Sequence, residues 1–295
     1  MASRPAQLRA LLASGRMVVA PGAYDCITGR LIEQAGFNCI YMTGAGTSAT
    51  LGFPDYGLIT QTEMTANAGR IARATKIPVI ADADTGYGNE LNVFRTVQEY
   101  EREGVAGIHI EDQVTPKRCG HLDGKEVISI EDYAAKIRAA ADARRDPDFL
   151  IIARTDARAV TSFDDAIARA NAAIEAGADM AFVEAMQTMA ELEAVPKLVR
   201  GPCMLNIVHG GKTPEVPLDV AEAAGYKLTI LPGMLLRTII GACDAVLQGI
   251  QAGKGYPSGA HMGKPAEIFH RMGADEWLPR RNKYRDPLEN KAAAE

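Results

Sequence analysis

The chain has 295 residues, of which 47% are hydrophobic and 23% are charged, and its formal net charge is −5. This acidic balance offers no basic surface for nucleic acid, and no run approaches the roughly 18 consecutive apolar residues that a membrane span requires. A chain of this length and hydrophobic content can bury one large core, so we expect a single domain.

The N-terminal segment predicts an amphipathic helix and no signal peptide. Leu8, Leu11 and Leu12 share one helical face, while Arg9 and Arg16 interrupt the apolar stretch that a leader would need. The five cysteines of the chain are odd in number and form no CxxC pair. This usage indicates a reducing cytoplasm and argues against a disulfide framework or a structural zinc site.

Short, almost continuously apolar runs then recur along the chain, and each ends in polar or glycine-rich residues. Unbroken apolar runs of strand length are typical of parallel strands that are buried on both faces. The runs begin at Val18, Cys39, Pro78, Gly107, Leu150, Met180, Cys203 and Tyr226. Between them lie amphipathic segments, which indicate helices.

Four of these helices are expected to begin with a capping box, in which an acidic residue follows the capping residue by three positions. The capping residues are Thr60, Ser129, Ser162 and Thr188. Eight strand–helix units in one chain predict a (β/α)8 TIM barrel. A doubly wound sheet is the alternative, which is weakened because no G-x-G-x-x-G fingerprint follows the first strand.

A further helical extension, from about 235 to 285, follows the eighth strand. It includes an amphipathic stretch with Ile268, Phe269 and Met272, which a barrel closed by eight units does not need. We therefore expect residues 1–295 to form one barrel domain whose extension makes contacts between subunits.

Carboxylates gather at the expected carboxyl ends of two neighbouring strands, the end at which such barrels carry their active sites. Asp82 and Asp84 are two residues apart and so face the same side of a strand, and Glu111 ends the next strand. Like charges this close repel one another unless a cation lies among them. Oxygen ligands without a set of His and Cys favour Mg²⁺ or Mn²⁺ over zinc.

The segment PKRCGHLDGK places a cysteine among cations on a loop after the fourth strand. Lys117 and Arg118 precede Cys119, and His121 follows it. Cationic neighbours favour the thiolate and make the sulfur chemically useful. The alternative interpretation is a solvated basic loop with an incidental cysteine.

Several segments, in their order along the chain, resemble the isocitrate lyase/phosphoenolpyruvate mutase superfamily. They are YMTGAGTSATLGFPD, ADADTGYGN, GIHIEDQVTPKRCGH, IIARTDA and FVEA, within about Val18 to Gly233. The resemblance implies a (β/α)8 barrel whose eighth helix is swapped with a neighbouring subunit in a homotetramer, built as a dimer of dimers. It also implies a Mg²⁺ cofactor and a small 2-oxo or 2-hydroxy carboxylate substrate.

Within the superfamily, KRCGH resembles the loop of the carbon–carbon lyases, whereas mutases and phosphonopyruvate hydrolases have no cysteine there. The implied reaction is a retro-aldol (reverse Claisen) cleavage of a 2-hydroxy di- or tricarboxylate to a 2-oxo acid, such as pyruvate, and a second carboxylate. Cys119 would protonate the carbanion of the second product. Lys117 and Arg118 would neutralise developing charge, and His121 would tune the thiol or bind a carboxylate.

The resemblance implies roles for the other strand-end residues too. Asp82 and Asp84 would bind Mg²⁺, with Glu111 behind them, and the metal would stabilise the substrate's C2 oxygen. The implied substrate-binding residues are Thr43, Gly44 and Ala45 through their backbone, Asp55, Arg154 as a carboxylate clamp, Glu184 and Asn206. Tyr41 is the candidate for handling the proton of the substrate hydroxyl.

Two departures from the superfamily bear on the substrate. The loop GHLDGK lacks the arginine of methylisocitrate lyases, and His209 stands where those enzymes have a glutamate. Both differences favour a malate-type substrate such as 2,3-dimethylmalate over 2-methylisocitrate. An oxaloacetate decarboxylase on the same scaffold, which would not need Cys119, is the alternative function, and a non-enzymatic barrel is disfavoured by the intact site residues.

Overall fold

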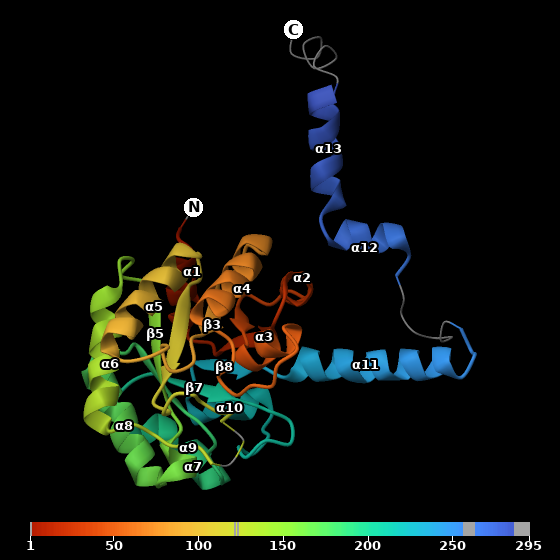
Figure 1. The fold of residues 1–295 in the computed structure, drawn as a ribbon. Helices are drawn as coiled ribbons and strands as arrows, with labels where there is room; N and C mark the ends of the chain where they lie inside the picture. The colour runs from red at the N-terminus through yellow and green to blue at the C-terminus, as the bar shows by residue number, and fades with distance from the viewer. Residues whose placement is uncertain (1, 121, 123, 256–262, 286–295) are drawn as a thin grey trace. The chain divides into compact units, whose positions relative to one another are not determined.

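The computed structural model describes residues 2–120, 122, 124–255 and 263–285. In the first of two compact units, Met1–Ile239, parallel strands form a closed barrel in which β8 pairs with β1 (Figure 1). The strands are β1 (Val18–Ala23), β2 (Ile40–Met42), β3 (Val79–Asp82), β4 (Gly107–Glu111), β5 (Leu150–Thr155), β6 (Met180–Val183), β7 (Cys203–Asn206) and β8 (Leu228–Leu231). The predicted (β/α)8 barrel is confirmed.

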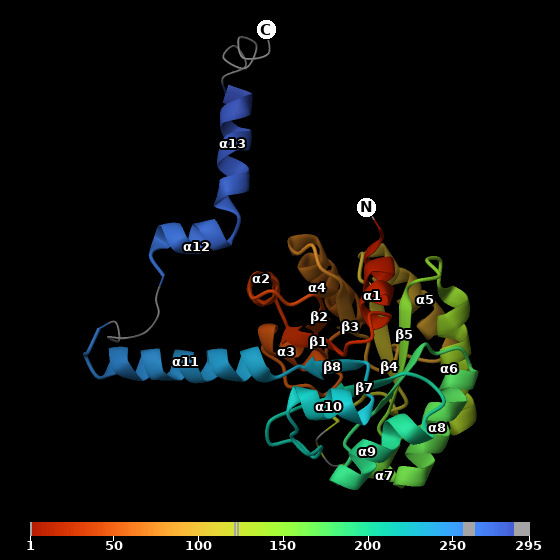
Figure 2. The ribbon, with the colours of Figure 1, turned by 180° about the vertical axis from the view of Figure 1, so that it is seen from behind.

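Helices alternate with the strands and surround the barrel, as the two opposite views show (Figures 1 and 2). They are α1 (Arg4–Leu12), α2 (Cys26–Gln34), α3 (Gly44–Thr50), α4 (Gln61–Ala74), α5 (Glu90–Arg102), α6 (Ile130–Ala143), α7 (Ala157–Val160), α8 (Phe163–Glu175), α9 (Met189–Leu198) and α10 (Leu218–Ala224). The helix predicted at the N-terminus is α1, which precedes β1 and therefore lies outside the strand–helix repeat.

The predicted capping residues all accept a hydrogen bond from the backbone N–H three residues later. They are Thr60, Ser129, Ser162 and Thr188. Only at Thr60 does the acidic side chain bond back, where the Thr60 N–H donates to Glu63 Oε2 at 2.7 Å. Asp132 and Asp165 have side chains one methylene shorter, and Glu191 instead accepts from the Gln187 N–H at 2.7 Å. Three of the four predicted boxes are therefore simple caps.

The side chains of each strand alternate between the barrel interior and the layer under the helices. On β5, Ile151 and Ala153 pack outward, whereas Ile152 packs inside the barrel together with Leu8 of α1. Arg154 takes the next inward position, at the carboxyl end of the barrel, because the strand period is two residues. The same alternation brings Asp82, Glu111, Glu184 and Asn206 to that end of the barrel.

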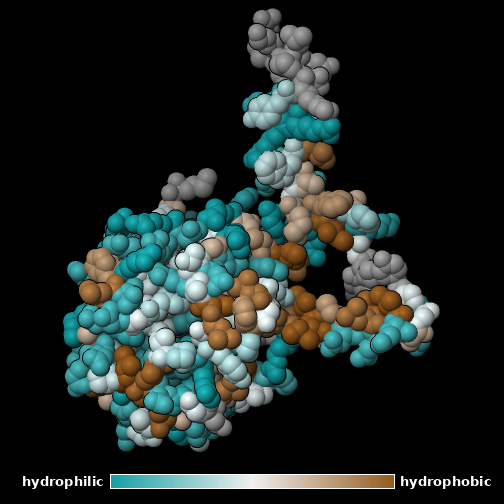
Figure 3. All heavy atoms as spheres, viewed as in Figure 1, coloured by the Kyte–Doolittle hydropathy of each residue, from teal (hydrophilic) through white to brown (hydrophobic). Residues whose placement is uncertain are grey.

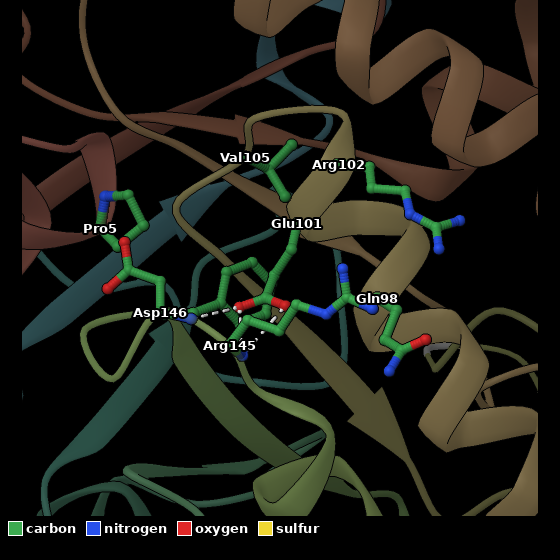
Figure 4. A pocket seen from close by; sticks show the side chains of 8 residues that line it. Pro5, Gln98, Glu101, Arg102, Val105, Arg145 and Asp146 are labelled. Atoms are coloured by element: carbon green, nitrogen blue, oxygen red, sulfur yellow. Dashed lines mark hydrogen bonds between the residues drawn. The ribbon is translucent and has the colours of Figure 1, made fainter.

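A cavity of about 280 Å³ lies at the opposite end of the barrel, where the chain enters β4 and β5 (Figure 4). Its lining consists of Pro5, Gln98, Glu101, Arg102, Val105, Arg145, Asp146 and Phe149. The Glu101 carboxylate accepts hydrogen bonds from the N–H groups of Arg145 and Asp146, each at 3.0 Å. Because chemistry in such barrels takes place at the carboxyl ends of the strands, this cavity is not the candidate active site.

The second unit, Ile240–Glu295, comprises most of α11 (Met234–Gln251), α12 (Pro265–Arg271) and α13 (Ala274–Arg285). Hydrophobic side chains gather along α11 in the space-filling view (Figure 3). The exposed large apolar residues of this unit are Ile240, Leu247, Ile250, Ile268, Phe269, Trp277, Leu278 and Tyr284. Among the helices of the described residues, none is both long enough and apolar enough to cross a membrane.

Candidate active site

A cavity of about 120 Å³ opens at the carboxyl ends of the strands. Its lining consists of Tyr41, Thr43, Ala45, Asp55, Asp82, Cys119, Gly120, Arg154, Glu184, Asn206, Val208, Pro232, Gly233 and Leu236. Most of the residues predicted from the sequence therefore meet here, although they come from distant parts of the chain.

Asp82 is the centre of the acidic side of this cavity. Its Oδ2 atom accepts from the Gly44 N–H at 3.2 Å and from the Tyr41 hydroxyl at 3.4 Å, and Oδ1 accepts from the Asp84 N–H at 2.9 Å. A Cβ atom on Gly44 would lie 2.5 Å from Asp82 Oδ2, so only glycine fits there. The N–H of Gly44, predicted to hold a substrate carboxylate, is thus engaged by Asp82.

Asp84 reaches the cluster in a different way from the one predicted. β3 ends at Asp82, and Asp84 lies beyond it with φ of 46°, in the left-handed region that a non-glycine residue rarely adopts. Strand alternation therefore does not place this side chain, and the turn after the strand does. Backbone strain of this kind is common where a site must be held in a set geometry.

Lys117 supplies the cation that the carboxylate cluster calls for. Its ammonium lies 2.8 Å from Asp84 Oδ1 and also contacts Asp55 Oδ1, and 5% of the side chain is exposed. Burial acts to lower the pKa of Lys117, but the carboxylates of Asp84 and Asp55 outweigh it and raise the pKa well above its usual value. Lys117 is therefore charged at neutral pH. The sequence predicted its charge but not this position.

The charged groups of the site give Asp82 and Asp84 different pKa values. Burial acts to raise the pKa of Asp82, but His109, which is protonated in the acidic range where Asp82 titrates, together with Lys117 and Arg154 lowers it to about 2. Burial raises the pKa of Asp84 to about 6, and Lys117 only partly offsets this effect. Asp82 is accordingly the carboxylate that stays ionised over the wider pH range.

The donor set fits Mg²⁺ only if substrate and water complete the coordination. No group of three or more His, Cys, Asp or Glu side chains in the described part of the chain is arranged to hold a metal ion alone. Mg²⁺, however, is often bound through one or two carboxylates, with water and substrate oxygens filling the other positions. Asp82 and Asp84 provide two such carboxylates. Glu111 Oε1, also buried, has no hydrogen-bond partner among the described residues.

Arg154 lies near the carboxyl end of β5 and is surrounded by carboxylates. Its Nε and Nη2 atoms donate to the two oxygens of Asp156 at 2.9 and 3.2 Å, and Nη1 lies 3.1 Å from Glu111 Oε2. Nη2 is 3.8 Å from Glu184 Oε2, and the guanidinium lies 5.3 Å from the ring centre of Phe182. The fork of Nε and Nη2 is thus occupied by Asp156, so a further planar carboxylate would bind to the remaining N–H groups of Nη1 and Nη2.

Sequence reasoning gave Asp156 and Lys125 no role, yet both belong to this part of the site. The Lys125 ammonium donates to Asp156 Oδ1 at 2.9 Å, and 1% of its side chain is exposed. Burial acts to raise the pKa of Asp156, but Arg154 and Lys125 lower it to about 2. The signals were present: Asp156 directly follows β5, two residues after Arg154, and Lys125 ends the GHLDGK loop.

His109 is a further residue without a predicted role, and it lies below Tyr41 inside the barrel. Its Nε2 atom is 2.8 Å from the Tyr41 hydroxyl, and the two rings stack at 5.7 Å. Burial lowers the pKa of His109 to about 4, which Asp82 only partly offsets, so the imidazole is neutral at pH 7. Burial, together with Asp82, raises the pKa of Tyr41 well above its usual value, so the phenol keeps its proton.

The predicted residues of the cysteine loop occupy different environments. Cys119 is half-buried and lines the cavity. Arg118 is exposed and is not part of the lining, and its backbone exchanges two hydrogen bonds of 2.9 Å with the side chain of Gln113. His121 lies outside the described residues.

The remaining predicted residues lie on β6 and β7. Asn206 Nδ2 donates to Glu184 Oε2 at 2.9 Å, which fixes both side chains at the cavity wall. Val208 lines the cavity, whereas His209 is exposed and has Nδ1 3.0 Å from Glu215 Oε2. His209, which stands where methylisocitrate lyases have a glutamate, therefore does not line the cavity, and its neighbour Val208 does.

Comparisons with known proteins agree with this geometry. The family model described as phosphoenolpyruvate phosphomutase matches residues 8–251. A 2,3-dimethylmalate lyase of Eubacterium barkeri is 50% identical over 77% of this chain and 79% of its own length. A 2-methylisocitrate lyase of Aeropyrum pernix is 46% identical over 82% and 78% of the two chains. A solved phosphonopyruvate hydrolase in complex with oxalate and Mg²⁺ has a TM-score of 0.84 at 31% identity, covering 96% and 99%.

The ion pairs of Arg154 lead to a prediction about stability. The substitution Arg154→Met leaves Glu111 and Asp156 buried without their main partner, and such a loss typically lowers the free energy of unfolding by about 3–5 kcal/mol. The matched control is Arg73→Met, because Arg73 forms an exposed pair with Glu103 and such pairs contribute about 1 kcal/mol or less. The free energy of unfolding in urea, at one protein concentration, measures both. Equal losses in the two variants would contradict the assignment of Arg154 as the main buried counter-charge.

Proposed function

The chain belongs to the phosphoenolpyruvate phosphomutase family, within the isocitrate lyase superfamily, and from this membership we propose a Mg²⁺-dependent carbon–carbon lyase. Its substrate is a 2-hydroxy di- or tricarboxylate, and its products are a 2-oxo acid such as pyruvate and a second carboxylate. One observation carries the proposal: the half-buried Cys119 lines the same small cavity as Arg154 and Asp82. An acid, a carboxylate clamp and a metal-binding carboxylate are the groups that this cleavage needs.

In the proposed reaction, each residue of the cavity has a distinct role. Arg154 binds one substrate carboxylate, and Asp82 and Asp84 hold Mg²⁺, which when bound stabilises negative charge on the substrate oxygens. When the bond between C2 and C3 breaks, the C2 hydroxyl loses its proton to solvent and becomes a carbonyl, and the electron pair of the broken bond stays on C3. The Cys119 thiol gives its proton to that carbon, and the thiolate recovers a proton from solvent. Tyr41 keeps its own proton and therefore suits a hydrogen bond to the substrate hydroxyl oxygen.

We infer a malate-type substrate ahead of a tricarboxylate. The GHLDGK loop and His209 lack the arginine and the glutamate that the resemblance gives to methylisocitrate lyases, and the cavity at this site is small. The similarity to a 2,3-dimethylmalate lyase at 50% identity supports the same choice. We therefore place 2,3-dimethylmalate ahead of 2-methylisocitrate.

A panel of 2-hydroxy diacids and triacids tests this function. With Mg²⁺ present, we expect 2-oxo acid to be released from 2,3-dimethylmalate faster than from 2-methylisocitrate. Chelation by EDTA should abolish turnover, and Mg²⁺ or Mn²⁺ should restore it, because Asp82 and Asp84 cannot stabilise the charge on substrate oxygen themselves. Release of 2-oxo acid is read with a coupled assay. Full activity in EDTA, or no cleavage of any acid in the panel, would refute the proposal.

The role of Cys119 is tested by Cys119→Ser. A serine hydroxyl is similar in size but far less acidic than a thiol, whose reference pKa is about 8.5, and one general acid contributes roughly 10²–10⁴-fold in rate. We expect lyase turnover to fall by that factor, while decarboxylation of oxaloacetate, which solvent can complete, falls far less. The matched control is Cys26→Ser, since Cys26 is also half-buried but lies at the start of α2. Wild-type lyase rates in Cys119→Ser would favour a decarboxylase.

We also propose a homotetramer, built as a dimer of helix-swapped dimers. The exposed apolar side chains of the second unit support contacts between subunits, because surfaces of this kind are usually covered in an assembly. Light scattering should give the mass of four chains at micromolar concentration. Phe269→Asp, which puts a charge on α12, should lower that mass. A monomeric wild-type protein would exclude the proposed assembly.

A cytoplasmic location is proposed from the thiols. None of the five cysteines forms a disulfide, and two of them, Cys39 and Cys203, are buried. Free thiols without a disulfide framework are typical of a reducing compartment. We expect a thiol titration of the protein, isolated under non-oxidising conditions, to find all five cysteines reduced.

A further inference from the structure

Lys125 is almost completely buried, although it ends the loop that carries Cys119. Its side chain is 1% exposed, and its ammonium has two partners, the carbonyl oxygen of Gly120 and Asp156 Oδ1 at 2.9 Å. A buried ammonium is costly unless it is paired and hydrogen-bonded. Both partners belong to the site, because Gly120 directly follows Cys119 and Asp156 holds the guanidinium of Arg154.

Gly120 itself packs directly on the carboxylate clamp. A Cβ atom at this position would lie 2.4 Å from Arg154 Nη2 and 2.7 Å from Glu184 Cγ. The backbone next to Cys119 therefore lies against the clamp with no room for a side chain. The bond from Lys125 to the Gly120 carbonyl holds this backbone in place from the other side.

Asp156 is shared between the two cations. Oδ1 accepts from Lys125 at 2.9 Å and from Arg154 Nη2 at 3.2 Å, while Oδ2 accepts from Arg154 Nε at 2.9 Å. The backbone N–H of Asp156 donates to Asp112 Oδ1 at 2.9 Å, which fixes the carboxylate relative to the barrel. Asp156 thus links the ammonium of Lys125 to the guanidinium of Arg154 through one carboxylate.

We propose that Lys125 is a positioning residue that sets the distance between the Cys119 thiol and the Arg154 guanidinium. Its ammonium bonds the carbonyl oxygen of Gly120, next to Cys119, and the carboxylate of Asp156, which holds Arg154. The role deepens the proposed lyase function and rests on it. It explains why a cation is buried at the end of a loop where the neighbouring Glu126 is exposed.

The test replaces the ammonium with an apolar side chain of similar length in Lys125→Met. Misplacement of a reacting group by about 1 Å costs on the order of 10²-fold in rate, so we expect kcat to fall roughly 10- to 100-fold. KM should change less than about threefold, because Asp156 still orients Arg154 for substrate binding. Lys125→Arg, which keeps the charge, should recover part of kcat. The control Lys76→Met makes the same change at an exposed lysine of the α4–β3 connection and should alter neither constant.

A second measurement does not depend on turnover. Alkylation of Cys119 by iodoacetamide, followed by mass spectrometry of its peptide, reports how firmly the loop backbone is held. In Lys125→Met the rate should rise by roughly tenfold, because a charge-assisted hydrogen bond to Gly120 is lost. In Lys76→Met it should match the wild type.

The outcomes separate this inference from the proposed function. Wild-type kcat and wild-type alkylation in Lys125→Met would overturn the positioning role, even if the enzyme is an active lyase. If Lys125→Met lowers the unfolding temperature and kcat falls only in proportion to the fraction of unfolded protein, Lys125 has a purely structural role and the positioning role is overturned. Should Lys125→Met fail to fold, Lys125→Gln, which keeps a donor for Gly120 but loses the charge that pairs with Asp156, should show changes in kcat and alkylation in the same direction but smaller, and no change in either would overturn the role. Faster alkylation in a protein that cleaves no substrate would leave the positioning role standing and reject the lyase.

Discussion

The site depends on one buried cation, the guanidinium of Arg154, because three carboxylates converge on it. Glu111, Asp156 and Glu184 approach it from β4, the end of β5 and β6. Without that positive charge, burial of these acids would be strongly unfavourable. The closed barrel makes the convergence possible, since successive parallel strands bring inward-facing residues to one ring. The Phe182 ring under the guanidinium completes the support.

Polar side chains of the outer helices hold the strand ends from behind. Tyr133 of α6 donates to the Arg154 carbonyl oxygen at 2.6 Å, and Tyr100 of α5 donates to the Asp82 carbonyl oxygen at 2.8 Å. Lys136, also on α6, reaches the carbonyl of Thr85 at 3.1 Å. These bonds act on the backbone of the residues whose side chains form the site, or of their neighbours. They restrict motion at the strand ends, where the hydrogen-bond ladder of the barrel stops.

The parts of the structure that follow from local pattern could be predicted, and those that depend on charge and distant contacts could not. Apolar runs and turn residues gave the barrel and put Asp82, Arg154 and Asn206 at its carboxyl end. The pattern could not show that Lys117 fills the space among the aspartates, because its position depends on a loop that crosses from β4 toward Asp55. Buried Lys125 looked like an ordinary loop cation for the same reason. Its burial is set by Asp156, which is 31 residues away in the chain.

The ammonium of Lys117 lies among Asp84, Asp55 and Asp82, and it bears on whether folding requires a metal ion. The acidic cluster carries its own counter-ion, so its charge balance does not require a metal ion. The fold is thereby independent of the Mg²⁺ ion that the proposed lyase reaction requires. At low Mg²⁺ the chain would still fold, and under the proposed function addition of the ion would then be enough to start turnover.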